Sequence, residues 1–385
     1  MSPSGFLPYG RQEIGDEDVA AVAAALRDPM ITQGPLVERF EAAFAESVEA
    51  SYAVAFANGT AALHGAAFAA ELGPGDESIT TAITFAASAN CARYVGADVR
   101  LLDVDRATWN LDVVAAAAAA GERTRAVVAV SFAGLPVDLS PLQPLRERGI
   151  AVIEDASHAI GAHRSRIPVG ADAGGADMTT FSFHPVKTMT TGEGGMVTTG
   201  SAELAERLRA FRTHGIHRDG GAAGPHDGAW WYEQRELGFN YRITDFQCAL
   251  GISQLGRVDA WVERRNEIAA RYRELLNGEE RIELPPEPPA GSRHGRHLLP
   301  IRVRAGAQAR LAVFDALRAA GIGVQVHYIP LYRFPYWRER GGASAETCPE
   351  SERYYAGAIS LPMFPGLTDA DVTRVRDALL AALEL

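Results

Sequence analysis

The stretch Phe181-Ser182-Phe183-His184-Pro185-Val186-Lys187, followed by Thr190-Thr191-Gly192-Glu193-Gly194-Gly195, decides the fold prediction. Residues 178–183 have the apolar pattern of a buried strand, and the glycines predict a turn beyond them. Lys187 therefore lies between a buried strand and a turn, where loss of water lowers the pKa of an amine. Such an amine can serve as a Schiff-base lysine, although most lysines are solvated surface charges.

Strand and helix patterns alternate before this stretch. Short apolar runs predict buried strands at residues 52–57, 78–85, 99–104, 126–132 and 151–154. Helical spacing is found after Asp16, a candidate N-cap, and again at residues 36–44, 59–72 and 115–120. Strands that alternate with helices indicate an α/β fold with a mostly parallel sheet covered on both faces.

The pattern changes near residue 250. Residues 243–277 predict one long charged helix, and residues 285–289 form a proline-rich linker or surface loop. Shorter strand and helix signals follow at 297–303, 311–320, 323–328 and 369–383. We therefore expect a large domain over residues 1–255, with the N-terminal segment included, and a smaller C-terminal α/β domain over residues 256–385.

The composition excludes several classes of protein. A formal net charge of −11 argues against general binding to nucleic acid or to an anionic membrane. Cys91, Cys248 and Cys348 are too few and too far apart to suggest a disulfide framework or a metal cluster. No signal peptide is evident, and no apolar run approaches the ~18–20 residues of a spanning helix. A cytoplasmic location fits these features.

Two further motifs carry candidate chemistry. Glu154 and Asp155 end an apolar strand ahead of His158, and the carboxyl ends of strands are where α/β folds bind ligands. A carboxylate there can pair with a pyridinium nitrogen, or it can simply cap the next turn. Asn58-Gly59-Thr60 opens a helix after a strand, which suits a phosphate but also describes an ordinary turn.

Taken together, the three motifs resemble the DegT/DnrJ/EryC1/StrS sugar aminotransferases, which are fold-type I enzymes that use pyridoxal 5′-phosphate (PLP). The resemblance runs from Pro8-Tyr9-Gly10 to Leu361-Pro362-Met363-Phe364-Pro365. It implies PLP as the cofactor, with pyridoxamine phosphate as its intermediate form. It also implies transfer of an amino group from L-glutamate to a sugar nucleotide.

The resemblance gives three residues a catalytic role. Lys187 would hold the cofactor as a Schiff base and then move the proton between the donor's Cα and C4′ of the cofactor. Asp155 would keep the pyridine nitrogen protonated, and His158 would touch the ring hydroxyl or the ring face. Some family members carry histidine in place of the lysine and dehydrate their substrate. Lysine at position 187 therefore favours transamination.

The resemblance also implies the remaining cofactor contacts. Phe85 would stack on the ring, or else it is a core aromatic at a strand end. Thr60, the Ala61 backbone and Ser182 would hold the phosphate. Asn240 matches an asparagine that reaches the phosphate of the neighbouring subunit's cofactor. A homodimer with shared active sites is therefore expected.

Within the family, several segments are most similar to the pseudaminic-acid enzyme that makes UDP-4-amino-4,6-dideoxy-N-acetyl-β-L-altrosamine from a UDP-linked 4-keto-6-deoxy sugar. The similarity places one group of residues near the sugar nucleotide: Tyr9, Ile31, Thr32, Gln33, Gly34, Gln325, His327 and Tyr328. A helix break at 32–34 and alternating strand residues at 326 and 328 are the structural alternatives.

Other functions stay open at this point. GDP- or dTDP-linked keto sugars, or a cyclitol, would use the same cofactor residues, so those residues cannot separate these substrates. A non-catalytic regulatory protein of the same fold would be expected to lack the lysine or the phosphate turn. Arg242, His214, His217 and Arg218 are candidate anion contacts, and surface salt bridges would explain them equally well.

Overall fold

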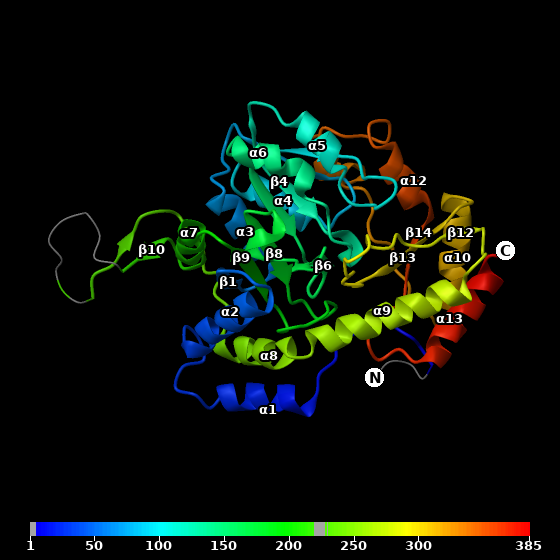
Figure 1. Cartoon of the computed structure of the whole chain (residues 1–385), viewed down its shortest axis with the longest axis horizontal. Coiled ribbons are helices and arrows are strands. Elements are labelled where there is room, and N and C mark those ends of the chain that lie inside the picture. Colours follow the sequence, from blue (N-terminus) through cyan, green and yellow to red (C-terminus); the bar gives the residue numbers. More distant parts are fainter. Residues whose placement is uncertain (1–4, 219–227, 229) are drawn as a thin grey trace.

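The computed structural model describes residues 5–218, 228 and 230–385. Within them a seven-stranded sheet, in the order β1-β9-β8-β5-β4-β2-β3, forms the centre of the molecule (Figure 1). Its strands are β1 Tyr52–Phe56, β2 Glu77–Thr81, β3 Asp98–Leu102, β4 Thr124–Val130, β5 Ala151–Asp155, β8 Met178–Ser182 and β9 Gly195–Thr199. All pairings are parallel except those of β9 with β1 and β8. The predicted α/β class with a mostly parallel sheet is confirmed.

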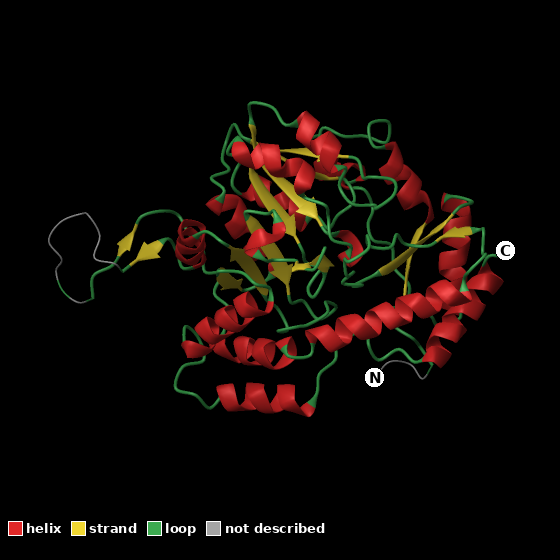
Figure 2. Cartoon of the chain, viewed as in Figure 1, coloured by secondary structure: helices red, strands yellow, loops and turns green. Residues whose placement is uncertain are grey.

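Both faces of this sheet are buried, which explains the continuous apolar runs of its strands. Along β4, Ala126 and Val128 pack into one core cluster, whereas Val127 and Ala129 pack into another on the opposite face. Helices cover both faces (Figure 2). The helices of this part are α1 Asp16–Ala25, α2 Pro35–Ser47, α3 Gly59–Ala69, α4 Ala87–Tyr94, α5 Val113–Ala119, α6 Gln143–Glu147, α7 Ala202–Arg212 and α8 Asp245–Leu255.

A smaller unit follows in the chain. Its three-stranded antiparallel sheet comprises β12 Ile282–Glu283, β13 Leu299–Val303 and β14 Ala358–Leu361. Its helices are α9 Val258–Leu275, α10 Ala307–Ala319, α11 Pro335–Arg338, α12 Pro349–Gly357 and α13 Asp369–Ala382. The expected domain division between residues 255 and 256 stays a prediction. Leu7, from the N-terminal segment, packs into the core cluster of this smaller unit.

Short elements complete the described chain. Two hairpins consist of β6 His163–Arg164 with β7 Ile167–Pro168, and of β10 Ile216–His217 with β11 Glu233–Gln234. The second hairpin extends away from the body beside α7 (Figure 1). No helix in residues 5–218, 228 and 230–385 has both the length and the apolar character needed to cross a bilayer. The cytoplasmic location stays a prediction.

Three local predictions were wrong. The long helix over 243–277 is two helices, α8 and α9, because the chain turns at Gly256 and Arg257. Asp16 is not the N-cap of α1; Gly15 takes that place, and Asp18 accepts its backbone N–H at 2.9 Å. Residues 323–328 form no regular strand and make a single bridge, between Gln325 and Ser360. Periodicity alone could not reveal these breaks, because tertiary contacts decide them.

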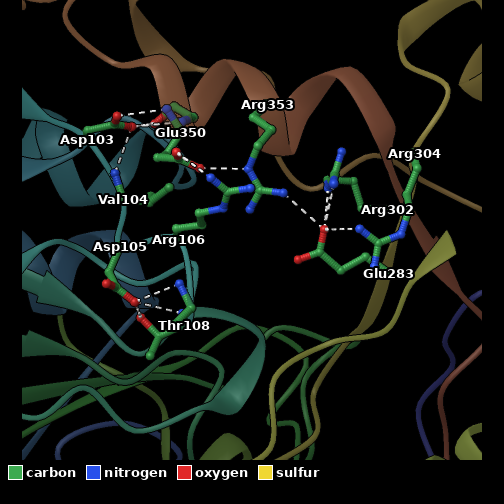
Figure 3. Close-up of polar contacts among 12 residues, drawn as sticks. Asp103, Val104, Asp105, Arg106, Thr108, Glu283, Arg302, Arg304, Glu350 and Arg353 are labelled. Carbon is green, nitrogen blue, oxygen red and sulfur yellow. Dashed lines mark hydrogen bonds and ion pairs between the residues drawn. The ribbon is translucent and has the colours of Figure 1, made fainter. Parts of the chain in front are cut away.

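A charged network joins the large sheet to the smaller unit (Figure 3). Asp103, just after β3, accepts hydrogen bonds from the backbone N–H groups of Glu350 and Ser351 at 2.9 and 2.7 Å, and from Ser351 Oγ at 2.6 Å. It thereby satisfies free N–H groups in the first turn of α12. Arg353 then bridges Glu350 to Glu283 of β12, at 2.6 and 3.0 Å.

We expect Asp103→Ala to lower the free energy of unfolding by about 1–2 kcal/mol, because three donors at the junction lose their acceptor. Urea unfolding followed by circular dichroism measures this loss. Glu17→Ala, at an exposed position in α1, is the matched control and should change stability by less than about 0.5 kcal/mol. Equal stability of the two variants would contradict a role for Asp103 in holding the junction.

Candidate active site

A cavity of about 610 Å³ lies at the carboxyl ends of the parallel strands, since it is lined by the last residues of β5 and β8. This is the edge at which open α/β sheets bind ligands. Most of the predicted site residues line it together: Tyr9, Thr60, Ala61, Phe85, Asp155, His158, Ser182, Lys187, His327 and Tyr328. These residues come from distant parts of the sequence, and the fold brings them to one place.

One end of the cavity is the first turn of α3. The Asn58 side chain caps the helix by accepting from Ala61 N at 2.8 Å, which leaves the N–H groups of Gly59 and Thr60 without helical acceptors. Ser182 lies against this turn, because a Cβ built on Gly59 would be only 2.8 Å from Ser182 Cβ. Only glycine allows the end of β8 to approach the helix so closely. The result is a small cradle of N–H and O–H donors.

Asp155 is buried at the end of β5 and is fixed by two donors. Ser88 Oγ donates to Oδ2 at 2.6 Å, and Ser157 N donates to Oδ1 at 3.0 Å. Because a carboxylate can only accept, the Ser88 hydroxyl donates its proton to Asp155. Thr84 Oγ1, 2.8 Å from Ser88 Oγ, can then donate to Ser88. Asp155 therefore stands in one orientation at the base of the cavity.

Lys187 lies on the loop between the antiparallel strands β8 and β9. The loop is closed by Phe183, whose N–H donates to Gly194 O at 2.8 Å and whose carbonyl accepts from Thr190 Oγ1 at 2.8 Å. Burial lowers the pKa of the Lys187 amine to about 8, although the nearby Asp155 charge raises it. More of this amine is therefore unprotonated near neutral pH than is usual for lysine.

The whole chain contains one lysine, Lys187, against 36 arginines. Arginine cannot replace lysine where an amine must lose its proton and attack a carbonyl, because the guanidinium stays charged. Nothing in fold stability requires one lysine among so many arginines. The single lysine is therefore a second indication of a chemical role for Lys187, separate from the motif around it.

One wall of the cavity consists of neutral rings. His158 stacks near His297, with ring centroids 4.5 Å apart, and burial holds the pKa of both imidazoles well below the usual value. Burial also lowers the pKa of His327 to about 4 and raises the pKa of Tyr328. His158 has protein partners on both nitrogens, the Ala133 N–H and the Tyr328 hydroxyl, so its ring face is the part left to contact a ligand.

Two residues at the site, His297 in the lining and Ser88 behind Asp155, were missed by the sequence prediction or given no role in it. His297 begins a stretch predicted to be a strand, and its Nδ1 has no hydrogen-bond partner among the described residues. Ser88 lies inside the quoted segment 84–90, but its contact with Asp155 depends on the packing of α4 against the sheet. His297 follows Arg293 and Arg296, directly before a strand, and belongs to no motif, so no signal in the sequence pointed to it.

Other predicted residues lie outside this cavity. Gln325 and Asn240 are exposed and make single bridges, to Ser360 and to Thr213. The 31–34 loop is held elsewhere, where Asp245 accepts from Gly34 N at 2.8 Å. These residues do not complete the site of their own chain.

Gln33 lines a second cavity, of about 550 Å³, which also holds the four candidate anion contacts. Its lining includes one carboxylate, Glu206, and the basic residues Arg209, Arg212, His214, His217, Arg218 and Arg242. Arg212 donates hydrogen bonds to Glu41 and to the Ala55 carbonyl, and His217 is hydrogen-bonded to Glu236. The Arg242 Nε is buried without a hydrogen-bond partner among the described residues.

The lining of the first cavity fits PLP. The turn at Gly59 and Thr60, with Ser182, supplies donors for a phosphate at a helix N-terminus. Asp155 supplies a buried carboxylate for a pyridinium nitrogen, and Lys187 supplies an amine with a lowered pKa. Phe85, 61% exposed, lies at the cavity, where its ring can cover a bound ring.

Comparison with known proteins agrees with this fit. The model of the DegT/DnrJ/EryC1/StrS aminotransferase family matches residues 12–380. The spore coat polysaccharide biosynthesis protein SpsC of Bacillus subtilis is 37% identical over 97% of this chain and 96% of its own. These matches cover nearly the whole chain.

Solved structures give the same result. The putative sugar aminotransferase Spr1654 from Streptococcus pneumoniae, in its PMP form, superposes with a TM-score of 0.91 at 27% identity, over 98% of this chain and 99% of its own. PseC from Helicobacter pylori, an aminotransferase of pseudoaminic acid biosynthesis, superposes with a TM-score of 0.89 at 28% identity, over the same shares. The PLP cofactor and the aminotransferase class predicted from the sequence are confirmed, and the chain belongs to the DegT/DnrJ/EryC1/StrS aminotransferase family.

Proposed function

We propose that this enzyme transfers the amino group of L-glutamate to C4 of a nucleotide-linked 4-keto-6-deoxy sugar. The acceptor we favour is the UDP-linked 4-keto-6-deoxy-N-acetyl-L-hexosamine that yields UDP-4-amino-4,6-dideoxy-N-acetyl-β-L-altrosamine. The observation that carries the proposal is the single lysine of the chain, whose amine has a lowered pKa in one cavity with Asp155 and the Thr60 turn. The similarity to PseC, an aminotransferase of pseudoaminic acid biosynthesis, supports the choice of sugar.

The lining of the cavity supports an uncharged acceptor group. Lys187, Asp155 and Glu193 are its charged residues, and no arginine is among the described residues that line it. The polar wall includes the neutral donors or acceptors Tyr9, His158, His297, His327 and Tyr328. Hydroxyl and keto oxygens of a hexose suit such a wall, because they need hydrogen bonds and no counter-charge.

Each residue would act at a stated atom. When bound, PLP supplies an electron sink that makes a proton on the donor's α-carbon removable. Lys187 Nζ would act as a base that takes this proton and delivers it to C4′ of the cofactor. Asp155, fixed by Ser88, would hold a proton on the ring nitrogen. Thr60 and Ser182, with the free N–H groups of Gly59 and Thr60, would bind the phosphate, whereas the predicted Ala61 N–H is taken by Asn58. His158 and Phe85 would lie against the two faces of the ring.

The carboxylates of L-glutamate need cations that this cavity lacks. The second cavity has them, and Arg242 there makes no ion pair among the described residues. We therefore propose a homodimer in which Asn240 and Arg242 of one subunit, with its loop of Ile31, Thr32, Gln33 and Gly34, complete the site of the other. Gln325, exposed beside His327, is placed at the sugar-nucleotide side of the same site.

Borohydride reduction should fix one cofactor per chain to the peptide that contains Lys187, since no other lysine exists. Peptide mass spectrometry locates the label. Lys187→Ala should lose the visible absorbance band and at least about 1000-fold of the activity, because the base and the covalent anchor are both gone. Lys187→Arg is the matched control: it keeps the charge and should be as inactive. A label elsewhere, or a retained band in Lys187→Ala, would refute the role.

The acceptor is tested with purified enzyme loaded with L-glutamate and then given UDP-, GDP- or dTDP-linked 4-keto-6-deoxy sugars. We expect the UDP sugar with an N-acetyl group to react at least about 10-fold faster than the others, because each lost hydrogen bond costs about that factor. Product mass and the return of the visible band are the readouts. Preference for a GDP or dTDP sugar would keep the aminotransferase and reject the proposed acceptor.

Mixing two inactive variants tests the shared sites. In hybrid dimers of Lys187→Ala with a combined Asn240→Ala and Arg242→Ala variant, one of the two sites keeps every residue. Random reassembly should therefore restore about a quarter of the wild-type activity. Mixing Lys187→Ala with Lys187→Arg is the control and should restore none. If the first mixture also stays inactive while hybrids form, each chain completes its own site.

A further inference from the structure

The backbone at Ala133 fixes the protonation of a buried imidazole. Ala133 N lies 3.3 Å from His158 Nδ1 in a geometry suited to donation. A backbone N–H can only donate, so Nδ1 must be the unprotonated, accepting nitrogen. Burial, with Lys187 and His327 nearby, keeps the pKa of His158 well below its usual value. The imidazole is therefore neutral and carries its one proton on Nε2.

That proton has a partner in place. Tyr328 Oη lies 3.2 Å from His158 Nε2, and the two rings are nearly parallel, at an interplanar angle of 17°. Because Nε2 donates, the tyrosine oxygen accepts. Burial raises the pKa of Tyr328, so the phenol stays protonated, and its own O–H remains available for another acceptor.

Close backbone packing surrounds the hydrogen bonds that link Ala133, His158 and Tyr328. Gly134, at a φ of +98°, packs so closely that a Cβ would lie 2.6 Å from His158 O. Gly295 N donates to Gly134 O at 2.8 Å, which holds the segment leading to His297 over the same turn. His297 covers one side of His158, with ring centroids 4.5 Å apart. A flip or displacement of the imidazole would break its hydrogen bonds with Ala133 and Tyr328.

The Tyr328 side chain lines the cavity. Tyr328 packs with Tyr9 in one cluster, and its ring centroid is 6.3 Å from that of the exposed Phe85. Asp155 and the cradle at Thr60 form other parts of the cavity wall.

We infer that Ala133, His158 and Tyr328 form a fixed chain of hydrogen bonds that makes the Tyr328 hydroxyl a donor to an uncharged oxygen, keto or hydroxyl, of the sugar acceptor. This inference rests on the proposed function, whose substrate recognition it specifies. His158 is a positioning residue in this chain, and Tyr328 is the group that touches the sugar. Since a fixed donor rejects a group that cannot accept, the chain also selects for the oxygen at that place.

The imidazole tautomer is the direct test and needs no substrate. Two-dimensional ¹⁵N–¹H spectra of ¹⁵N-histidine-labelled holoenzyme distinguish a protonated Nε2 from a protonated Nδ1, and His158→Gln assigns the signal by its disappearance. We expect protonated Nε2 and bare Nδ1 at neutral pH. Tyr328→Phe should shift the Nε2 signal and leave the tautomer unchanged, because Ala133 sets it. Protonated Nδ1, or an imidazolium, would overturn the inference.

The two half-reactions give the second test. Tyr328→Phe should lower kcat/KM for the keto sugar about 10- to 100-fold, and change the glutamate half-reaction less than about threefold, since one neutral hydrogen bond to the sugar is lost. Tyr336→Phe, at an exposed tyrosine outside the cavity, is the matched control. The wavelength of the visible band should not change in Tyr328→Phe.

Equal losses in both half-reactions, no loss, or a shifted band would each overturn the inference, and a shifted band would place the donor on the cofactor instead. A wild-type enzyme that does not respond to L-glutamate would refute the proposed function. The tautomer measurement would still test the hydrogen bonds among Ala133, His158 and Tyr328 in that case, because it needs no substrate.

Discussion

The parallel pairing of β5 with β8 is the constraint on which the site depends. Their register aligns Asp155 with Thr180, so the last residue of β5 stands at the level where β8 is about to end. The chain then leaves the sheet at Ser182, carries Lys187 over the cavity, and returns as the antiparallel β9. A shift of one residue would turn Asp155 to the other face of the sheet and separate it from the amine. Burial of both faces makes such a shift costly, since each face has its own apolar set.

Charge is divided between two cavities. The first holds one amine, two carboxylates and a wall of neutral imidazoles and phenols, and the second holds arginines. Burial without a counter-charge keeps the imidazoles neutral, because the charged form would lose its hydration. A neutral wall orients uncharged oxygens, whereas a dicarboxylate needs the arginines. Under the proposed function, the sugar would meet the neutral wall and the dicarboxylate donor the arginines, in a site shared between two chains.

Fixed orientation recurs around the reacting centre. The Ser88 hydroxyl donates to Asp155, and the Ala133 N–H determines which nitrogen of His158 accepts. In both cases a group that can only donate, or only accept, sets the state of its partner. Close glycine packing is found nearby, of Gly59 on Ser182 and of Gly134 on the backbone of His158. Groups held in this way need little reorganisation when a substrate binds, which is the usual basis of electrostatic preorganisation.

The sequence by itself determined the fold class, because alternating strand and helix patterns are local. It determined the cofactor and the family through the resemblance that the motifs at Lys187, Asp155 and Thr60 carry together, since each motif alone left another interpretation open. The sequence predicted one helix over 243–277, but the structure has two, because tertiary packing determines the turn at Gly256. Only the tertiary structure decided that His297 covers His158, that Ser88 reaches Asp155, and that Asn240 and the 31–34 loop lie away from their own chain's cavity. These are contacts between residues far apart in the chain, and neither periodicity nor motif spacing encodes which side chains meet when layers pack.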